Sequence, residues 1–142
     1  AEFGYVFQDY ALLPELTALE NVALPLYMQG ASRIAADTKA TAALERVGLG
    51  KRLDNLPSQL SGGEQQRVSI SRAIAHTPDV LFADEPTANL DTESSATVMD
   101  IFKELHKGGQ TIIMVTHEEE FARFAERIVK LDDGKIISDS RY

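Results

Sequence analysis

Apolar residues occur along this chain in two patterns, short continuous runs and a helical spacing, and these predict strands and helices. Residues 80–83 and 111–116 are short runs rich in apolar side chains, which is typical of parallel strands buried on both faces. The opening run 3–7 also predicts a strand. Within residues 93–106, apolar side chains instead recur at i, i+3, i+4 and i+7. That spacing predicts an amphipathic helix, which the glycine pair at 108–109 would end.

Capping signals predict the helices in the first half of the chain. The sequence Thr-Ala-Leu-Glu at 17–20 has the spacing of a capping box, so a helix begins there, and Pro25 should end or bend it. A second helix is predicted for residues 33–47, with Gly48 stopping it. Residues 14–60 are therefore expected to form a helical section rather separate from the remainder.

The second half of the chain alternates helices with strands. Ser61 and Glu64 form another capping box, and the helix that they begin is expected to run to His76. A short helix carrying Phe121 is predicted next, and residues 128–137 predict a hairpin. Strands that alternate with helices predict an α/β fold with a mostly parallel sheet flanked by helices.

Composition and charge narrow the classes of protein that fit this pattern. The chain has 142 residues, enough for one domain with a core, and its net charge of −8 argues against a general basic surface for nucleic acid. It has no cysteine, which excludes disulfides and thiolate metal sites. No apolar stretch approaches the roughly eighteen residues that span a membrane, so membrane contact is expected to need a partner. Because the strand at 3–7 starts without a turn or cap, we expect the chain to be part of a longer domain.

Two carboxylates follow a predicted strand. Asp84 and Glu85 come directly after the apolar run 80–83. In open α/β sheets, ligands lie beyond the carboxyl ends of the strands, which is where these side chains would be. Mg²⁺ keeps several waters, so Asp84 alone could hold it beside phosphates, and Glu85 could polarise an attacking water. The alternative is that Asp-Glu-Pro at 84–86 only forms a turn or caps a helix.

Two glycines open the helix predicted from Ser61. At Gly62 and Gly63, free N–H groups and the positive end of the helix dipole favour an anion, and a phosphate could approach the bare backbone closely. The alternative is that the two glycines only shape a tight turn into the helix. Arg67 and Arg72 on the same helix are interpreted as solvated charges.

Two further polar residues follow predicted strands. His117 comes directly after residues 111–116, and Gln8 follows the opening strand. An imidazole could hydrogen-bond a transferring phosphate, and an amide could orient water or ligate Mg²⁺. Each of them alone is an ordinary surface residue. Together with the carboxylates and the glycine pair, however, they place polar groups of the phosphoryl-transfer type at three strand ends.

Five short motifs resemble the ordered motifs of an ABC-type ATPase domain, with its P-loop NTPase-like fold. The Q-loop, signature, Walker B, D-loop and H-loop are matched, in that order, by Gln8, L-S-G-G-E-Q-Q-R at 60–67, V-L-F-A-D-E-P at 80–86, A-N-L-D at 88–91 and T-H at 116–117. Residues 12–26 and 121–128 look like the ATP-binding subunits of lipoprotein-releasing and macrolide-export systems. The resemblance implies a Q-loop and helical subdomain over about 9–60 and a core over about 61–142.

The resemblance implies ATP and Mg²⁺ as ligands and ATP hydrolysis as the reaction. Asp84 would hold Mg²⁺ through water, and Gln8 would sense the γ-phosphate and act as a further oxygen ligand of the metal. Glu85 would be the general base, and His117 would contact the γ-phosphate.

The resemblance also implies two protein partners. A second nucleotide-binding domain would close head-to-tail as a homodimer, with Asp91 bridging the two sites. The signature would then grip the ATP of the opposite subunit through Ser61, Gly62, Gly63 and Glu64. A transmembrane permease subunit would dock on the helical stretch around 14–30. That contact would hold the chain on the cytoplasmic, inner face of the cell membrane.

The chain departs from the family in one respect. No G-x-x-x-x-G-K-[ST] loop occurs in it, and in the family this loop and the first strands come before Gln8. We therefore predict that the chain alone binds ATP poorly and hydrolyses none measurably. Two alternatives stay open: a non-transport ABC ATPase of the DNA-repair or chromosome type, and a non-enzymatic fragment that associates with itself through uncovered strands.

Overall fold

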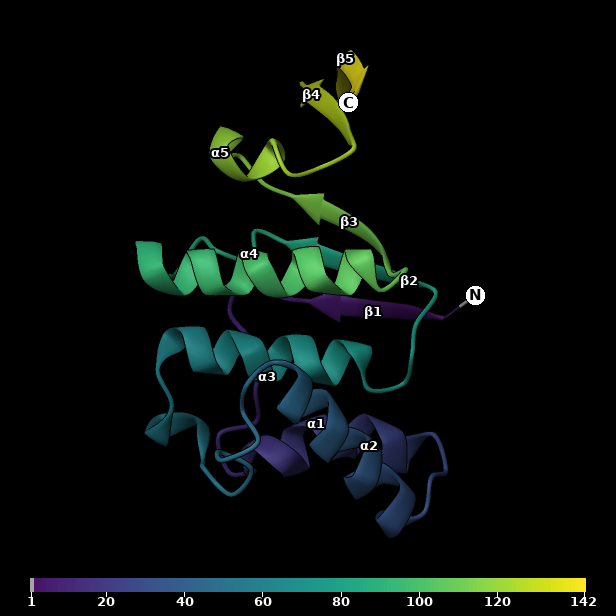
Figure 1. Cartoon of the computed structure of the whole chain (residues 1–142), viewed down its shortest axis with the longest axis vertical. Coiled ribbons are helices and arrows are strands. Elements are labelled where there is room, and N and C mark those ends of the chain that lie inside the picture. The colour runs from purple at the N-terminus through teal and green to yellow at the C-terminus, as the bar shows by residue number, and fades with distance from the viewer. Residues whose placement is uncertain (1) are drawn as a thin grey trace.

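A three-stranded parallel sheet lies at the centre of the molecule, in a computed structural model that describes residues 2–142 (Figure 1). In sheet order, the strands are β1 (Phe3–Val6), β2 (Val80–Asp84) and β3 (Thr111–Val115). Val6 pairs with Ala83, which pairs with Met114, so the carboxyl ends of all three strands meet at one edge. The mostly parallel α/β fold predicted from the sequence is confirmed.

Two helices cover one face of this sheet. Helix α3 (Gly62–Ile74) packs against β1, and α4 (Thr92–Lys107) packs beside α3 and against β3 (Figure 1). The approach of α3 is so close that a Cβ on Gly4 would lie 2.3 Å from the carbonyl oxygen of Ala73. A glycine in β1 is therefore required at this point, because a side chain would collide with the helix backbone.

The other face of the sheet is open in the part of the chain that the structure describes. Phe3 is 60% exposed, Ile113 48% and Val115 58%, and along each strand these positions alternate with more buried ones. The prediction that 80–83 and 111–116 are buried on both faces is therefore wrong. Helices α3 and α4 lie on one face only, and a continuous apolar run does not distinguish one covered face from two.

The helical section packs against the outer side of α3. Helices α1 (Ala18–Met28) and α2 (Arg33–Arg46) contact each other and α3, and a 3₁₀ turn, η1 (Pro57–Gln59), leads into α3 (Figure 1). Helix α1 continues through Pro25 to Met28, so of the two outcomes predicted for Pro25, an end or a bend, the end does not occur. Proline removes one N–H donor, and the burial of Val22 and Leu26 on either side keeps the helix continuous.

The predicted caps are present. Thr17 and Ser61 each form a complete capping box with the glutamate three residues later. Gly48 adopts φ +80° just beyond the end of α2, which is the left-handed conformation that commonly ends a helix at a glycine. The helices predicted for 33–47 and 93–106 are confirmed to within one or two residues at their ends.

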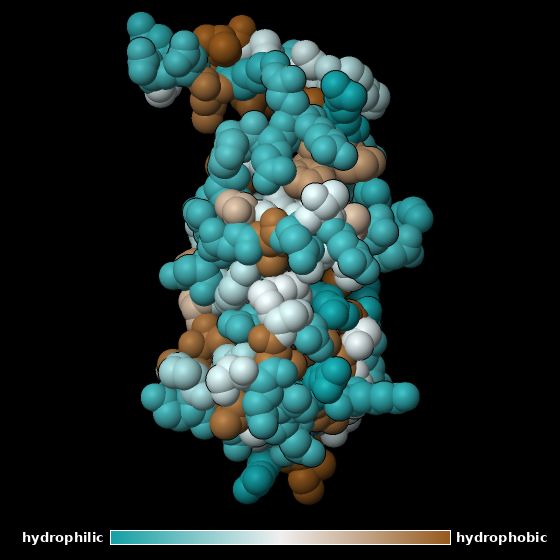
Figure 2. Space-filling model, turned by 90° about the vertical axis from the view of Figure 1, so that its left-hand side faces the viewer, coloured by the Kyte–Doolittle hydropathy of each residue, from teal (hydrophilic) through white to brown (hydrophobic). Residues whose placement is uncertain are grey.

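The C-terminal part forms a separate hairpin at one end of the molecule. After the short α5 (Glu119–Ala122), β4 (Arg127–Asp132) and β5 (Lys135–Arg141) pair antiparallel around a two-residue turn, as predicted. Asp133 and Gly134 both have positive φ, which gives the turn the twist that suits a hairpin. Figure 2 shows brown, apolar side chains at this end, where β4 and β5 leave aliphatic residues exposed. None of the helices in the described residues is long and apolar enough to cross a membrane.

Candidate functional site

The carboxyl edge of the sheet carries the first group of candidate residues. Asp84 is the last residue of β2, and its Oδ2 accepts a hydrogen bond of 3.3 Å from the Tyr5 hydroxyl on β1. Glu85 follows in the left-handed region, at φ +45°, and its N–H donates to the Val115 carbonyl of β3 at 2.8 Å. A non-glycine residue in this region costs about 1–3 kcal/mol and persists only where its surroundings hold it, often at functional sites.

The side chains of Glu85 and His117 lie within ion-pair distance of each other at this edge. The Oε1 of Glu85 lies 2.8 Å from the Nδ1 of His117, although 32 residues separate them in sequence. The Glu85 side chain is 19% exposed and that of His117 is 77% exposed. The hydrogen bond to Glu85 raises the pKa of His117, with further contributions from the charges of Glu85 and Glu118.

One oxygen of Glu85 is left without a partner. Its Oε2 is buried and makes no hydrogen bond within the described residues, which is costly for a carboxylate oxygen and rare in folded proteins. An acceptor in this state can take a hydrogen bond from a water molecule or a ligand. The geometry therefore suits a general base whose second oxygen is oriented by His117.

Gln8 lies at the same edge, just beyond β1. It is exposed, and its backbone carbonyl accepts a hydrogen bond of 3.1 Å from the Asn89 side chain. Gln8, the two carboxylates and His117 therefore share one edge of the sheet, because β1, β2 and β3 run parallel and in register.

Mg²⁺ fits the groups that the sheet edge offers. Residues 2–142 contain no cluster of three or more histidine, cysteine or acidic side chains able to hold a metal. Mg²⁺ needs only one or two protein carboxylates beside water and phosphate oxygens. Asp84, half-buried at the end of β2, and the exposed amide of Gln8 at the same sheet edge match that requirement.

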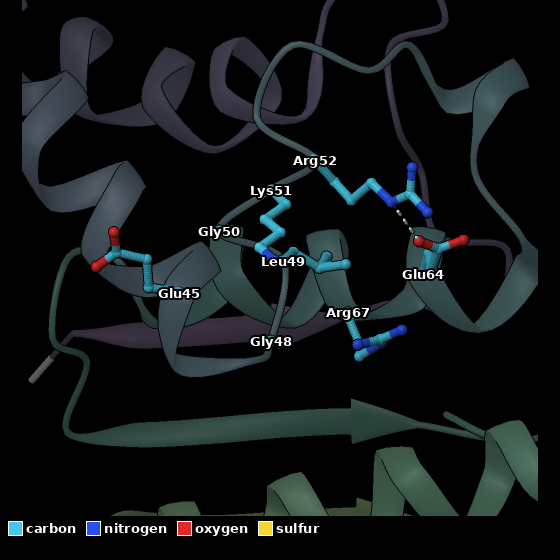
Figure 3. Close-up of a pocket in the computed structure, with 8 residues that line it drawn as sticks. All are labelled: Glu45, Gly48, Leu49, Gly50, Lys51, Arg52, Glu64 and Arg67. Carbon is cyan, nitrogen blue, oxygen red and sulfur yellow. Dashed lines mark ion pairs between the residues drawn. The ribbon is translucent and has the colours of Figure 1, made fainter.

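The second group of candidates lies at the N-terminus of α3. The Ser61 hydroxyl accepts from the Glu64 N–H and the Glu64 carboxylate accepts from the Ser61 N–H, both at 3.1 Å. The backbone hydrogen bond from Ser61 is the main cause that lowers the pKa of Glu64. Glu64 also pairs with Arg52 at 3.3 Å, across a cavity of about 660 Å³ between α3 and the segment after α2 (Figure 3). The Glu64 carboxylate is thus engaged in the cap and this ion pair.

The glycine pair has two different surroundings. A Cβ on Gly63 would lie 2.8 Å from both the Cβ and the Oγ of Ser94, so this glycine permits close contact between α3 and α4. A Cβ on Gly62 would lie 3.1 Å from the Tyr10 hydroxyl in the segment after Gln8. Gly62 is partly exposed, whereas Gly63 is buried. Packing therefore explains Gly63, and Gly62 faces the loop that carries Gln8.

Asp91 caps the neighbouring helix. Its carboxylate accepts a hydrogen bond of 2.7 Å from the Ser94 N–H at the start of α4, and that bond lowers the pKa of Asp91. Because Gly63 contacts Ser94, the N-termini of α3 and α4 lie side by side. The structure thus groups Ser61, the glycine pair and Asp91 at these helix ends.

Sequence reasoning missed several residues that hold the site together, and it misjudged two arginines. Arg67 donates to the Val47 carbonyl at 3.1 Å, and Arg72 donates to two carbonyls of the segment after Gln8. Neither is a free solvated charge, so that interpretation is wrong. Gln66 is fully buried on the apolar stripe that contains Ile70, and a polar residue on such a stripe is a signal that the sequence offered.

Comparisons with known proteins agree on one family. The sequence model of the ABC transporter family matches residues 1–88. The lipoprotein-releasing system ATP-binding protein LolD of Aquifex aeolicus is 48% identical over 138 residues, which is 97% of this chain and 62% of that protein. The macrolide export ATP-binding/permease protein MacB of a Shewanella species is 50% identical over 139 residues, 98% of this chain and 22% of that protein.

A solved structure has the same fold. It is a dimeric, post-hydrolysis state of an ATP-binding cassette bound to ADP and Pi, with a TM-score of 0.84 and 40% identity. The match covers 99% of this chain and 62% of the other. The family resemblance read from the motifs is therefore confirmed, and the chain spans less than two thirds of the length of these relatives.

Proposed function

Since this chain belongs to the ABC transporter family, we propose that it is part of the ATP-binding and ATP-hydrolysing subunit of an export system. It would supply the catalytic carboxylate, the γ-phosphate sensors and the signature helix. The relatives are ATP-binding proteins of lipoprotein-releasing and macrolide-export systems, which supports a transport role over one in DNA repair or chromosome structure. The net charge of −8 likewise disfavours nucleic acid as a partner.

The observation that carries this proposal is the Glu85–His117 pair with its unpartnered Oε2. Glu85 accepts a proton from the attacking water through Oε2, while Oε1 stays bonded to His117. The partly buried carboxylate is held by the turn after β2, so its position costs no reorganisation at the moment of reaction. His117, with its raised pKa, presents a donor toward the γ-phosphate.

The remaining groups bind and orient the nucleotide. Asp84 and Gln8 would hold Mg²⁺, which when bound neutralises charge on the phosphate oxygens. Ser61 and Gly62 present the N-terminus of α3, with its free N–H groups, to the γ-phosphate held by a second copy. Gly63 and Glu64 hold that terminus in shape through helix packing and the capping box. Asp91 lies at the adjacent helix end, where a partner subunit would approach.

Two partners follow from this arrangement. A second nucleotide-binding domain would form a homodimer across the ends of α3 and α4, and the dimeric state of the solved relative supports this. A membrane-embedded permease would bind the helical section around 14–30 from the cytoplasmic side of the membrane. The open face of the sheet supports self-association of the chain when it is isolated.

The test is an ATPase assay on this chain extended ahead of residue 1 by the phosphate-loop segment of a relative. We expect Mg-ATP turnover in the extended chain. The chain without the added segment should show no turnover, and calorimetric titration of it with Mg-ATP should show no micromolar binding. Glu85→Gln should abolish turnover, by about 10²-fold or more, and retain Mg-ATP binding. Glu104→Gln, which changes an exposed carboxylate near the C-terminal end of α4, is the matched control. Turnover that survives Glu85→Gln would refute the assignment of the base.

A further inference from the structure

The segment after Gln8 contains two consecutive residues in a rare backbone conformation. Tyr10 has φ +66° and Ala11 has φ +49°, and neither residue is a glycine. Side chains with a Cβ rarely adopt this left-handed region, and two such residues in succession need an external constraint. The question is which groups hold them.

The constraint comes from Arg72 on the signature helix α3. Its guanidinium donates to the Ala11 carbonyl at 2.6 Å and to the Tyr10 carbonyl at 2.9 Å. One planar group thus binds the carbonyls of both left-handed residues, 61 and 62 positions away in sequence. Arg72 is half-buried, and none of the ion pairs found among residues 2–142 includes it. Its donors are therefore committed to this loop.

Two more side chains bind the same loop from the sides of the candidate site. The Gln66 amide of α3 donates to the Phe7 carbonyl at 3.3 Å and to the Pro86 carbonyl, just after Glu85, at 2.7 Å. Asn89, in the segment that leads to Asp91, donates to the Gln8 carbonyl at 3.1 Å. Carbonyls on both sides of Gln8 are thus bonded to elements that carry other candidate residues.

We propose that Arg72 is a positioning residue that holds Tyr10 and Ala11 in the left-handed conformation. It thereby fixes the loop of residues 8–11, which carries Gln8, to the signature helix α3, so that the two move as one rigid unit. Gln8 and the Ser61–Gly63 end of α3 then move together when nucleotide is bound or lost. That this movement reports nucleotide rests on the proposed function. The hydrogen bonds by which Arg72 holds the loop, called the Arg72 clamp below, are a property of the fold and can be tested without nucleotide.

Physical chemistry explains why an arginine suits this position. A hydrogen bond from a charged donor is stronger than a neutral one, and the planar guanidinium can serve two carbonyls at a fixed spacing. Burial lowers the pKa of Arg72, and the charge of Asp9 partly opposes this. Lysine would keep the charge but lose the planar, two-donor geometry, and methionine would keep most of the length without either property.

The experiment measures amide hydrogen exchange of the loop in this protein by NMR. The informative amides are Tyr10, bonded to the Phe7 carbonyl, and Leu13, bonded to the Asn21 side chain. We expect Arg72→Met to speed exchange at both on the order of tenfold, because two charge-assisted bonds are lost. Arg72→Lys should have a smaller effect.

The matched control is Arg67→Met. Arg67 lies on the same helix, is also half-buried and also donates to a backbone carbonyl, but that carbonyl belongs to Val47 outside the loop. Exchange at Tyr10 and Leu13 should stay within about twofold of the unaltered protein. An equal acceleration in Arg67→Met and Arg72→Met would overturn the proposal, since it would show only a general loss of stability.

A rescue variant tests the backbone argument directly. Glycine adopts positive φ without a Cβ penalty, so Ala11→Gly should slow loop exchange several-fold when added to Arg72→Met. Ala11→Gly in the unaltered protein should change exchange little. If the rescue fails, Arg72 does not act by holding the left-handed conformation. Should Arg72→Met not fold, the comparison of Arg72→Lys with and without Ala11→Gly decides the same point.

A second experiment measures ATP hydrolysis by the chain extended with the phosphate-loop segment. Arg72→Met should lower kcat for Mg-ATP while KM stays within about twofold, because Gln8 loses its orientation while Asp84 and the phosphate loop still bind Mg-ATP. A rise in KM alone would contradict a positioning role. If no turnover occurs even with Arg72 intact, the proposed function fails. The exchange results still decide whether the Arg72 clamp holds the loop.

Discussion

The two halves of the candidate site are built in different ways. At the start of α3, shape is set by packing, because Gly63 is buried against Ser94 and the capping box bonds Ser61 to Glu64. At the sheet edge, the Glu85–His117 pair is held mainly by charge and hydrogen bonding, and the imidazole is largely exposed.

The two regions should therefore respond to different kinds of substitution, one to changes of side-chain volume and the other to changes of charge. A packed helix end resists small movements but fails when volume is added. A charged pair with one largely exposed partner responds to pH and to the loss of one charge more than to a change of volume on its exposed side. Steric changes should therefore damage the α3 end most, and charge changes should act on the sheet edge with little effect on folding.

The largest expected effect is that of Gly63→Ala. The added Cβ would lie 2.8 Å from the Cβ of Ser94, so α3 and α4 must separate. We expect the free energy of unfolding to fall by about 1–3 kcal/mol in urea denaturation. Adding Ser94→Gly, which removes the opposing Cβ, should recover part of the loss. Equal stability of Gly63→Ala and the unaltered protein would show that the helices are not in close contact here.

A smaller effect is expected from Ser61→Ala. The change removes the hydroxyl that accepts the Glu64 N–H, and loss of such an N-cap costs about 1 kcal/mol. Thermal unfolding should show a correspondingly lower Tm. Ser61→Asp, which can also cap a helix, is the control and should retain most of the stability. If Ser61→Ala and Ser61→Asp unfold alike, the cap contributes nothing measurable.

The smallest effect on folding concerns the charged pair. The Glu85 hydrogen bond raises the pKa of His117, so the folded protein holds this proton more tightly than the unfolded chain does. The resulting stability is fully present below the unfolded pKa of about 6.5 and is lost as pH rises through the higher folded value. Because His117 is exposed, the stability change itself should be slight.

An NMR titration of the imidazoles is the sensitive measurement for this pair. Glu85→Gln should lower the pKa of His117 toward its ordinary value. His106, whose pKa is raised by its hydrogen bond to Glu126, serves as an internal control and should not change. An unchanged His117 titration would mean that the pair does not form in solution.

Short-range rules determined much of this protein from sequence. The sequence predicted the capping boxes at Thr17 and Ser61, the stop at Gly48 and the hairpin over 128–137, and all are present. Each depends on residues close to one another in the chain. The alternation of helices and strands likewise predicted the parallel sheet and, with it, the shared edge that carries Gln8 and the other strand-end residues.

Tertiary structure decided what depends on distant parts of the chain. Only the fold shows that one sheet face is open, because burial depends on where α3 and α4 lie and not on the composition of a strand. Arg72 reaches Ala11 across 61 residues, and His117 reaches Glu85 across 32. No local pattern encodes such pairs, because each arises when packing of the helices and sheet brings separate segments together. The sequence therefore determined the elements and the candidate chemistry, and the tertiary contacts determined how those residues are held.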